Sequence, residues 1–210
     1  MLSFNGNRMV GTIPDSLGNL TRLRVLALNK NDFTGSFPAI GGLSLLTVLD
    51  LSSNNLKGTI PEFIYSFTSL QIFVIDANDF NGTIPSNIGY VSSAQLINFN
   101  ANSLTGTIPT QFGNLLLLEE MYLAKNDFTG TIPSMIYSLN HLTNIDLSSN
   151  NLNGNIPSNL EALSHLRHLN FNGNALKGTI PTQIGYLTSL ESIFLSSNKL
   201  SGSIPTQIGS

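Results

Sequence analysis

The sequence predicts a single solenoid of about nine stacked 24-residue coils, with a parallel β-sheet along its inner face. Three ladders of residues that run in phase predict this fold. All nine prolines recur every 24 residues, apart from one spacing of 23 between Pro38 and Pro61. Half of the 18 glycines stand three residues before those prolines. Asparagines recur in the same phase, and we call them the Asn ladder: Asn7, Asn31, Asn54, Asn78, Asn102, Asn126, Asn150, Asn174 and Asn198. A fixed period of roughly 20 to 50 residues is typical of a solenoid.

The first element of each coil is a short strand. In the segment LTVLDLSS, Leu49 and Leu51 alternate with Val48, Asp50 and Ser52. This period of two indicates a strand with its leucines inward and the other side chains outward. The ladder Asn ends the strand. We expect its side-chain amide to donate and accept hydrogen bonds with backbone groups of neighbouring coils, which the turn leaves buried.

The second half of each coil follows the motif L-x-G-x-I-P. The Leu or Phe of the motif returns to the core, and the Gly permits a tight backbone path. The Pro ends a second short extended segment because it cannot donate a ladder hydrogen bond. The residues after it are too few and too interrupted by Gly for an α-helix, so we expect a 3₁₀ turn.

Two coils depart from the pattern. One is a residue shorter between Pro38 and Ile40, and Ala94 stands at a core position that other coils give to Leu. We expect a local kink or looser packing at both places.

Composition excludes several classes of function. The absence of Cys excludes disulfides, thiol nucleophiles and thiolate metal sites. A net charge of −3, with only 10% charged residues, excludes the basic stripe that nucleic-acid binding needs. The 41% of apolar residues supports a core, so the chain is not disordered. The longest apolar runs are four or five residues, and we expect neither a membrane segment nor a signal peptide in this chain.

No pattern of residues predicts catalysis, a metal or a cofactor. Asp146, Ser148 and His168 fall on neighbouring coils, but an open sheet surface offers neither enclosure nor an oxyanion hole. Asp50 and Asp76 on adjacent coils are too few oxygen ligands for a calcium site. We therefore expect a protein that is not an enzyme.

The repeat, well seen in residues 142–165, resembles the plant-type leucine-rich repeat with L-x-G-x-I-P. The resemblance covers essentially the whole chain. It implies a right-handed leucine-rich-repeat solenoid of the α/β horseshoe type, mainly β with 3₁₀ turns. This subclass occurs in the ectodomains of receptor-like kinases, in receptor-like proteins and in relatives of polygalacturonase inhibitors. Members that fold alone usually carry Cys-bearing caps. We therefore expect residues 1–210 to be one uncapped solenoid from a longer protein at the cell surface or outside the cell.

The outward side chains of the inner sheet form a strip roughly 40 Å long on the concave face, at ~4.8 Å between strands. We call it the inner strip. Solenoids use such faces for partners, and binding hot spots favour aromatic side chains. Arg24, Glu119, Glu120, Arg167 and Glu191 lie beside the strip and would orient a ligand. The candidate binding residues are Asp50, Ile72, Val74, Asp76, Asn98, Tyr122, Asp146, His168, Asn170 and Phe194.

The second extended segment offers an alternative surface, an outer array of threonines. Its main members are Thr59, Thr83, Thr107, Thr131 and Thr179. A second column, which includes Thr105 and Thr129, stands two residues earlier in each coil. We expect spacings of ~6.5–7 Å along a strand and ~4.8 Å between strands. Regular threonine arrays resemble ice-binding solenoids, some of which are plant leucine-rich repeats. Thr also suits any exposed strand position.

Three functions remain open. The first is non-enzymatic recognition of a protein, peptide or glycan on the concave face, with no nucleic acid and no cofactor. The second is an ice-binding or structural solenoid that uses the outer array. The third, inhibition of a secreted glycosidase, ranks lower. It needs a charged concave cluster, and only two of the nine residues between the paired strand leucines are charged.

Overall fold

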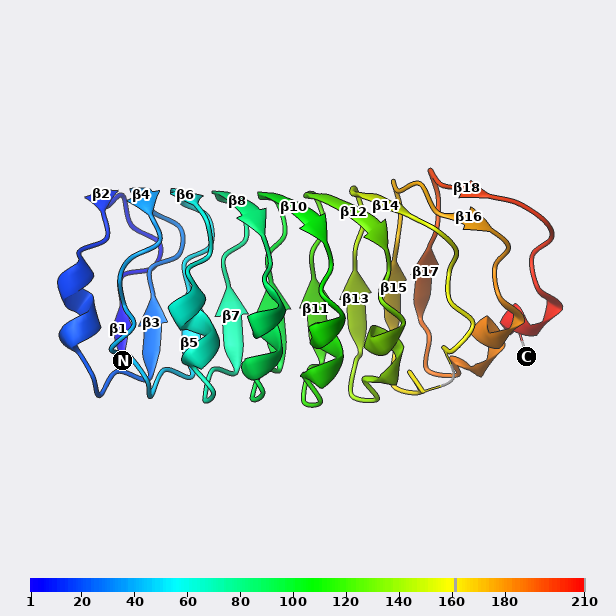
Figure 1. Ribbon diagram of the computed structural model, residues 1–210, viewed down its shortest axis with the longest axis horizontal. Coiled ribbons are helices and arrows are strands. Elements are labelled where there is room, and N and C mark those ends of the chain that lie inside the picture. The colour runs from blue at the N-terminus through cyan, green and yellow to red at the C-terminus, as the bar shows by residue number, and fades with distance from the viewer. Residues whose placement is uncertain (161, 210) are drawn as a thin grey trace.

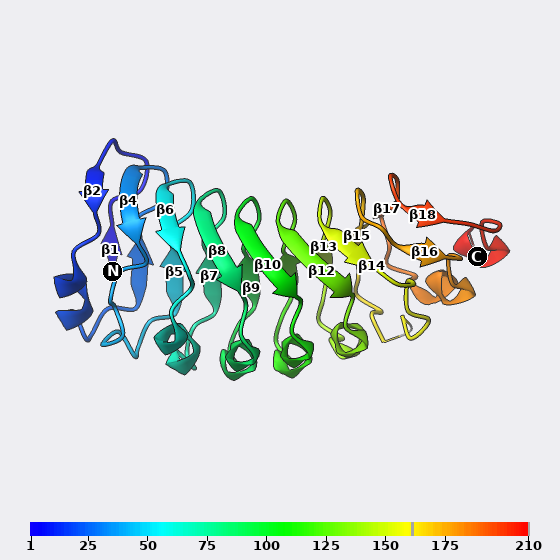
Figure 2. The same ribbon diagram turned by 45° about the horizontal axis from the view of Figure 1, so that its top comes forward.

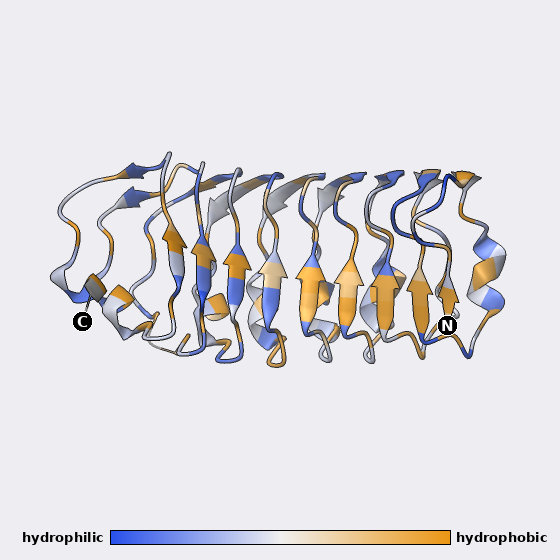
Figure 3. Cartoon of the chain, turned by 180° about the vertical axis from the view of Figure 1, so that it is seen from behind, coloured by the Kyte–Doolittle hydropathy of each residue, from blue (hydrophilic) through white to orange (hydrophobic). Residues whose placement is uncertain are grey.

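A computed structural model describes residues 1–160 and 162–209, and it shows coils stacked along one long axis (Figure 1). The two termini lie at opposite ends of the stack. The inner sheet forms one face, 3₁₀ helices form the opposite face, and the outer strands follow one edge (Figures 1 and 3). The predicted solenoid is confirmed. No α-helix occurs in the described ranges, and no helix there is long and apolar enough to cross a membrane.

The inner sheet contains nine parallel strands, paired in sequence order. Each full strand has three residues, of which the middle one enters the core. The strands are β1 (Leu2–Ser3), β3 (Val25–Ala27), β5 (Val48–Asp50), β7 (Ile72–Val74), β9 (Leu96–Asn98), β11 (Glu120–Tyr122), β13 (Asn144–Asp146), β15 (His168–Asn170) and β17 (Ser192–Phe194). The middle residues of β3 to β15 are at most 1% exposed.

The L-x-G-x-I-P segments form the outer strands. Seven of them make a parallel sheet: β2 (Val10–Thr12), β4 (Asp32–Ser36), β6 (Asn55–Gly58), β8 (Asp79–Thr83), β10 (Ser103–Thr107), β12 (Asp127–Thr131) and β14 (Asn151–Asn153). β16 (Lys177–Gly178) and β18 (Lys199–Leu200) form a separate pair. Between β14 and β16 the sheet is interrupted, and a single bridge between Asn155 and Lys177 links the two parts. Asn155 stands where most coils carry Thr or Ser.

The segments after the prolines form the expected 3₁₀ turns. The helices are η1 (Asp15–Asn19), η2 (Glu62–Ser66), η3 (Ser86–Tyr90), η4 (Thr110–Asn114), η5 (Ser134–Ser138), η6 (Thr182–Tyr186) and η7 (Thr206–Gly209). The shortened coil after Pro38 has none, because the missing residue leaves too little chain for a full turn. In the coil after Pro157, no helix occurs among the described residues either.

The two irregular coils do not disturb the inner sheet. At the short coil, Val25 pairs with Val48, so the pairing absorbs the missing residue and every strand stays aligned. Ala94 is fully buried, and its N–H donates to the Val91 carbonyl at 3.0 Å. Leu118 makes the equivalent bond in the next coil at 2.9 Å. The expected kink at Ala94 is therefore not seen, and the main discontinuity lies instead between β14 and β16.

The Asn ladder makes the hydrogen bonds that its position predicts. Asn126 Nδ2 donates to the Phe99 carbonyl of the preceding coil at 2.9 Å and to the Leu123 carbonyl of its own coil at 3.3 Å. Asn126 Oδ1 accepts the N–H of Leu104 at 2.9 Å. The same pattern recurs in the neighbouring coils. One side chain thus bonds backbone groups of two coils, and the Phe99 and Leu123 carbonyls each accept from two successive ladder Asn side chains.

The residue before each ladder Asn is held in the left-handed region. Ala77, Ala101 and Lys125 have φ of 53°, 52° and 54°. This conformation is unfavourable for residues other than Gly. It recurs because the strand must turn sharply before the Asn amide can reach the backbone of the preceding coil.

Two tyrosines occupy positions that other coils give to glycine. Tyr65 and Tyr137 follow the apolar residue of their 3₁₀ turn, where other coils have residues such as Gly89 and Gly113. A Cβ at Gly113 would lie 2.6 Å from Met135 Cβ, so a side chain fits only where the neighbouring coil leaves room. The coil after Tyr137 has no 3₁₀ helix among its described residues, whereas for Tyr65 it is the preceding coil that has none. Both hydroxyls are buried without a hydrogen-bond partner in the described part of the chain.

Replacing Asn126 by Ala should lower the free energy of unfolding by roughly 1–3 kcal/mol, because the buried Leu104 N–H loses its partner and the Phe99 and Leu123 carbonyls each lose one of two amide donors. Urea unfolding followed by circular dichroism measures this. Asn153→Ala on the exposed outer face is the matched control and should change stability by less than about 0.5 kcal/mol. Equal effects of the two substitutions would contradict a stabilising role of the ladder.

Replacing Tyr137 by Phe should raise the free energy of unfolding by about 1 kcal/mol, because it removes a buried hydroxyl that has no partner. Tyr186→Phe is the control, since that side chain is 62% exposed and its hydroxyl reaches solvent. The same unfolding assay compares them. A loss of stability in Tyr137→Phe would show that the hydroxyl has a favourable partner.

Candidate ligand-binding face

The inner strip has three columns of side chains. The first and third residues of each strand face outward and supply two columns, and the residue two positions after each strand supplies the third. Tyr122, for example, lies on the strip between the buried Met121 and Leu123. All ten predicted binding residues lie on this face. Ile72 and His168 belong to the first column and Asp76 to the third. The second column holds Asp50, Val74, Asn98, Tyr122, Asp146, Asn170 and Phe194.

The strip changes in polarity along its length. Its first column is apolar from β3 to β9, where it carries Val25, Val48, Ile72 and Leu96. From β11 onward the same column is polar. Figure 3 shows this change as mostly orange inner strands near the N-terminus and blue segments toward the C-terminus. Of these four residues, only Ile72 was selected from the sequence. The other three could have been found, because each stands two residues before a second-column residue.

The acidic and amide residues of the second column have a structural task. Asp50, Asn98 and Asp146 accept the N–H two residues further on, at 3.0, 3.1 and 2.9 Å. Asn170 makes the same bond to the Asn172 N–H at 3.2 Å. This local bond is an Asx-type turn that ends the strand. The fold therefore already uses one side-chain oxygen of each of these residues for a hydrogen bond.

Asp76 lies beside a like charge. Burial raises the pKa of its carboxyl, and the nearby Asp50 carboxylate raises that pKa further, while a backbone hydrogen bond opposes the shift. Asn98 Nδ2 donates to Asp76 Oδ1 at 3.1 Å. No group of three His, Asp or Glu side chains in the described ranges could hold a metal ion.

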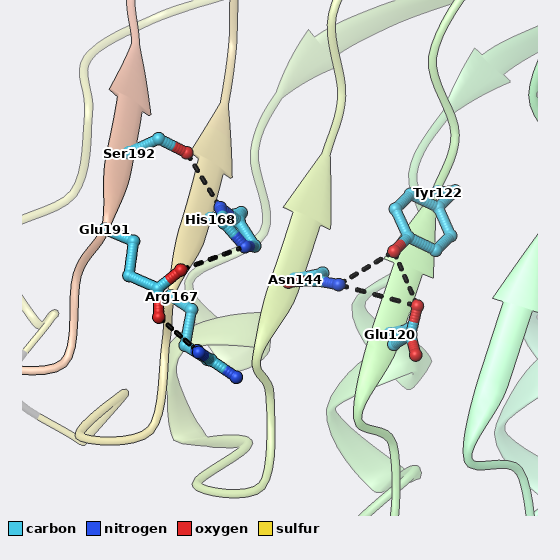
Figure 4. Close-up of polar contacts among 7 residues, drawn as sticks. All are labelled: Glu120, Tyr122, Asn144, Arg167, His168, Glu191 and Ser192. Carbon is cyan, nitrogen blue, oxygen red and sulfur yellow. Dashed lines mark hydrogen bonds and ion pairs between the residues drawn. The ribbon is translucent and has the colours of Figure 1, made fainter.

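Tyr122 is fixed by two neighbours. Its hydroxyl donates to Glu120 Oε2 at 2.5 Å and accepts from Asn144 Nδ2 at 2.8 Å (Figure 4). Partial burial raises the pKa of Tyr122 to about 12, and the bond to Glu120 acts in the same direction. The hydroxyl therefore stays protonated at neutral pH. Sequence reasoning did not select Asn144, which lies in the first column next to Glu120.

A second group lies beside it. Arg167 forms an ion pair with Glu191, and its Nε donates to Glu191 Oε1 at 2.6 Å. His168 Nε2 lies 3.6 Å from Glu191 Oε2, and His168 Nδ1 is 2.8 Å from Ser192 Oγ (Figure 4). Ser192 was also missed by sequence reasoning, because it carries no charge or aromatic ring.

A shallow pocket of about 230 Å³ lies on the strip between β11 and β17. Its lining includes Tyr122, Asp146, His168, Asn170 and Phe194, which are five of the ten predicted residues. The other five lie on β5 to β9 or just after β7, outside this pocket. The structure thus divides the predicted site into a hollow at one end and a flatter stretch at the other.

The outer threonine array differs from its expected geometry. Strand pairing places Thr107 opposite Thr129, and Thr83 opposite Thr105. Neighbouring outer strands are thus offset by 22 residues, whereas inner strands such as β11 and β13 are offset by 24. The expected straight columns are therefore wrong. The threonines run obliquely across the tilted strands seen in Figure 2.

The array also has a packing role. A Cβ added at Gly106 would lie 2.8 Å from Thr83 Cγ2, so the threonine methyl occupies the space beside the glycine of the next coil. Gly106 has φ +78°, which independently favours Gly. Lys57 and Asp79, which pair in register, interrupt the array with charges.

These features define a solenoid of short repeats with two long parallel sheets, each of which exposes side chains to solvent. Leucine-rich repeat family models match residues 140–200, and also 45–67 and 117–139. The chain belongs to the leucine-rich repeat family. No curated protein sequence matches it.

Several solved structures match almost the whole chain. A TDR receptor is 35% identical with a TM-score of 0.96, over 98% of this chain and 36% of that one. The Arabidopsis receptor kinase HAESA, solved with the peptide hormone IDA and the co-receptor SERK1, is 34% identical with a TM-score of 0.97. That match covers 99% of this chain and 35% of HAESA. A plant ice-binding protein is 28% identical with a TM-score of 0.80, over 98% of this chain and 74% of that one. The chain spans about a third of the receptor structures.

Proposed function

We propose that this chain is a non-enzymatic recognition module from a receptor-like leucine-rich repeat protein, and that it binds a protein, peptide or glycan on the inner strip. The observation that carries the proposal is the exposed aromatic pocket between β11 and β17, on a strip that is otherwise apolar or held by internal hydrogen bonds. Exposed aromatic side chains next to fixed polar groups are typical of binding hot spots.

The similar structures support this proposal. HAESA was solved with a peptide hormone and a co-receptor, and RGFR1 was solved with RGF2. By analogy, we place this chain outside the cell, as part of a longer protein. The analogy concerns only the segment matched, since the chain spans a third of the HAESA structure.

The fold provides recognition through preorganisation. The Asn ladder and the Asx turns fix the backbone of the strip, and Glu120 and Asn144 fix Tyr122. A ligand therefore loses its own conformational freedom on binding but orders little of the protein. With a net charge of −3, long-range electrostatic attraction contributes little, so shape and local contacts determine affinity.

Tyr122→Ala should weaken binding of an inner-strip ligand by about 1–3 kcal/mol, if Tyr122 is one of the aromatic anchors. Ligands are first selected from a random peptide library against the intact chain, and affinities are then measured by calorimetry. Thr129→Ala on the outer face is the matched control and should leave affinity unchanged. Ligands that are insensitive to Tyr122 and Phe194 but lost on outer-face substitution would overturn the proposal.

Ice binding is a second candidate, favoured by the match to a plant ice-binding protein and by threonines on β8, β10 and β12. It predicts thermal hysteresis and shaped ice crystals with the purified chain. Thr107→Lys, in the middle of the array, should reduce the hysteresis, whereas Tyr122→Ala should not. The absence of hysteresis in the unmodified chain would exclude this function.

A further inference from the structure

The pocket on the inner strip has an acidic floor between aromatic walls. Tyr122 on β11 and Phe194 on β17 stand at its two ends, and Asp146 and Asn170 lie between them on β13 and β15. Phe194 is 50% exposed, which is unusual for a large apolar side chain. The hydroxyl of Tyr122 is occupied by Glu120 and Asn144, so the tyrosine offers the pocket mainly its ring.

Asp146 carries a charge that no cation of the described chain neutralises. Its Oδ1 accepts the N–H of Ser148 at 2.9 Å, and no Lys, Arg or His in the described ranges forms an ion pair with it. On the neighbouring strand Arg167 is already paired with Glu191, and the His168 ring also lies beside that carboxylate. The floor of the pocket is therefore negative, and it disfavours ligand groups such as carboxylate, phosphate or sulfate.

Other carboxylates along the inner strip also lack a positively charged partner in the described part of the chain. Asp50, Asp76 and Glu120 also lack a cationic partner among the described residues. The Asp50 carboxylate contributes to the raised pKa of the partly buried Asp76 carboxyl. A ligand that brings positive charge to this face relieves this repulsion, which gives the strip charge complementarity to a basic partner.

The chemistry of the pocket fits one kind of ligand group. A guanidinium or ammonium group can contact a carboxylate and lie against an aromatic face at the same time. Arg suits the site better than Lys, because its planar group stacks on a ring while its N–H donors reach the carboxylate and the Asn amide oxygen. The acidic floor and the aromatic walls thus favour the same ligand group.

Resting on the proposed recognition function, we propose that the inner strip binds an extended basic peptide, with an arginine guanidinium against Asp146 and the ring of the adjacent Tyr122. Apolar side chains of that peptide lie over Ile72, Val74 and Leu96 on β7 and β9. β13 lies two to three strands from these, or ~10–14 Å at the strand spacing. An extended peptide crosses this distance in ~3–4 residues at its usual rise, which sets the spacing between the arginine and the apolar anchor.

The test uses a positional-scanning library of acetylated, amidated octapeptides and the intact chain. Fluorescence anisotropy then compares the tightest arginine peptide with its citrulline form, which keeps the shape but removes the charge. We expect the citrulline peptide to bind about tenfold more weakly. We also expect the library to favour apolar residues three to four positions from the arginine.

Asp146→Asn is the decisive variant, since Asn98 and Asn170 make the same turn-closing bond at equivalent positions and the fold is thus preserved. In this variant the arginine and citrulline peptides should bind equally. Asp127→Asn on the outer strand β12 is the matched control and should retain the tenfold preference.

The outcomes separate the inference from the function on which it rests. Peptides that require Phe194 but show no arginine preference would overturn the inference and leave the recognition function standing. Binding of neutral oligosaccharides that depends on Phe194, with no peptide binding, would do the same. If neither peptides nor oligosaccharides bind in a way that depends on the inner strip, both the inference and the proposed function fail.

Discussion

The buried side-chain amide of the Asn ladder is the interaction on which the rest of the structure depends. After each three-residue strand the backbone turns, and carbonyls that follow the strand, such as those of Phe99 and Leu123, accept hydrogen bonds from ladder Asn side chains. Asn126 bonds two coils at once, because it donates to Phe99 and Leu123 and accepts from Leu104. Its position forces the preceding Lys125 into the left-handed region, at φ 54°. The strain at one residue is therefore the cost of three hydrogen bonds to buried backbone groups.

Because the ladder and the apolar core define each coil, the residues of the inner strip are free to differ from one coil to the next. This is why the strip can be apolar at Ile72 and Leu96 but acidic at Asp146 without any change in backbone path. Even there, the fold uses part of the surface chemistry, since Asp50 and Asp146 each close their own turn. Phe194 makes no such bond, and the fold does not explain why this apolar side chain is exposed.

Much of this arrangement could be predicted from the sequence, because period and alternation encode what happens along the chain. Leu49 and Leu51 identified the strand, and the ladder Asn identified its end. All ten candidate residues were placed on the correct face for the same reason. Contacts between neighbouring coils could not be predicted in the same way. The pairing of Thr107 with Thr129 depends on the angle at which coils cross, and the partnership of Tyr122 with Asn144 depends on rotamers. Tyr137 could be recognised as an exception to Gly, but its buried hydroxyl could not be predicted.

The unequal pairing of the two sheets has a mechanical consequence. Paired residues on neighbouring coils are 24 apart in the inner sheet and 22 apart in the outer sheet, so the outer strands are inclined relative to the inner ones. A laminate of this kind resists bending and torsion better than one whose layers run in a single direction. The inner strip thus lies on a stiff support. A force applied at one end of the molecule is therefore transmitted to the other end with little deformation of the coils between.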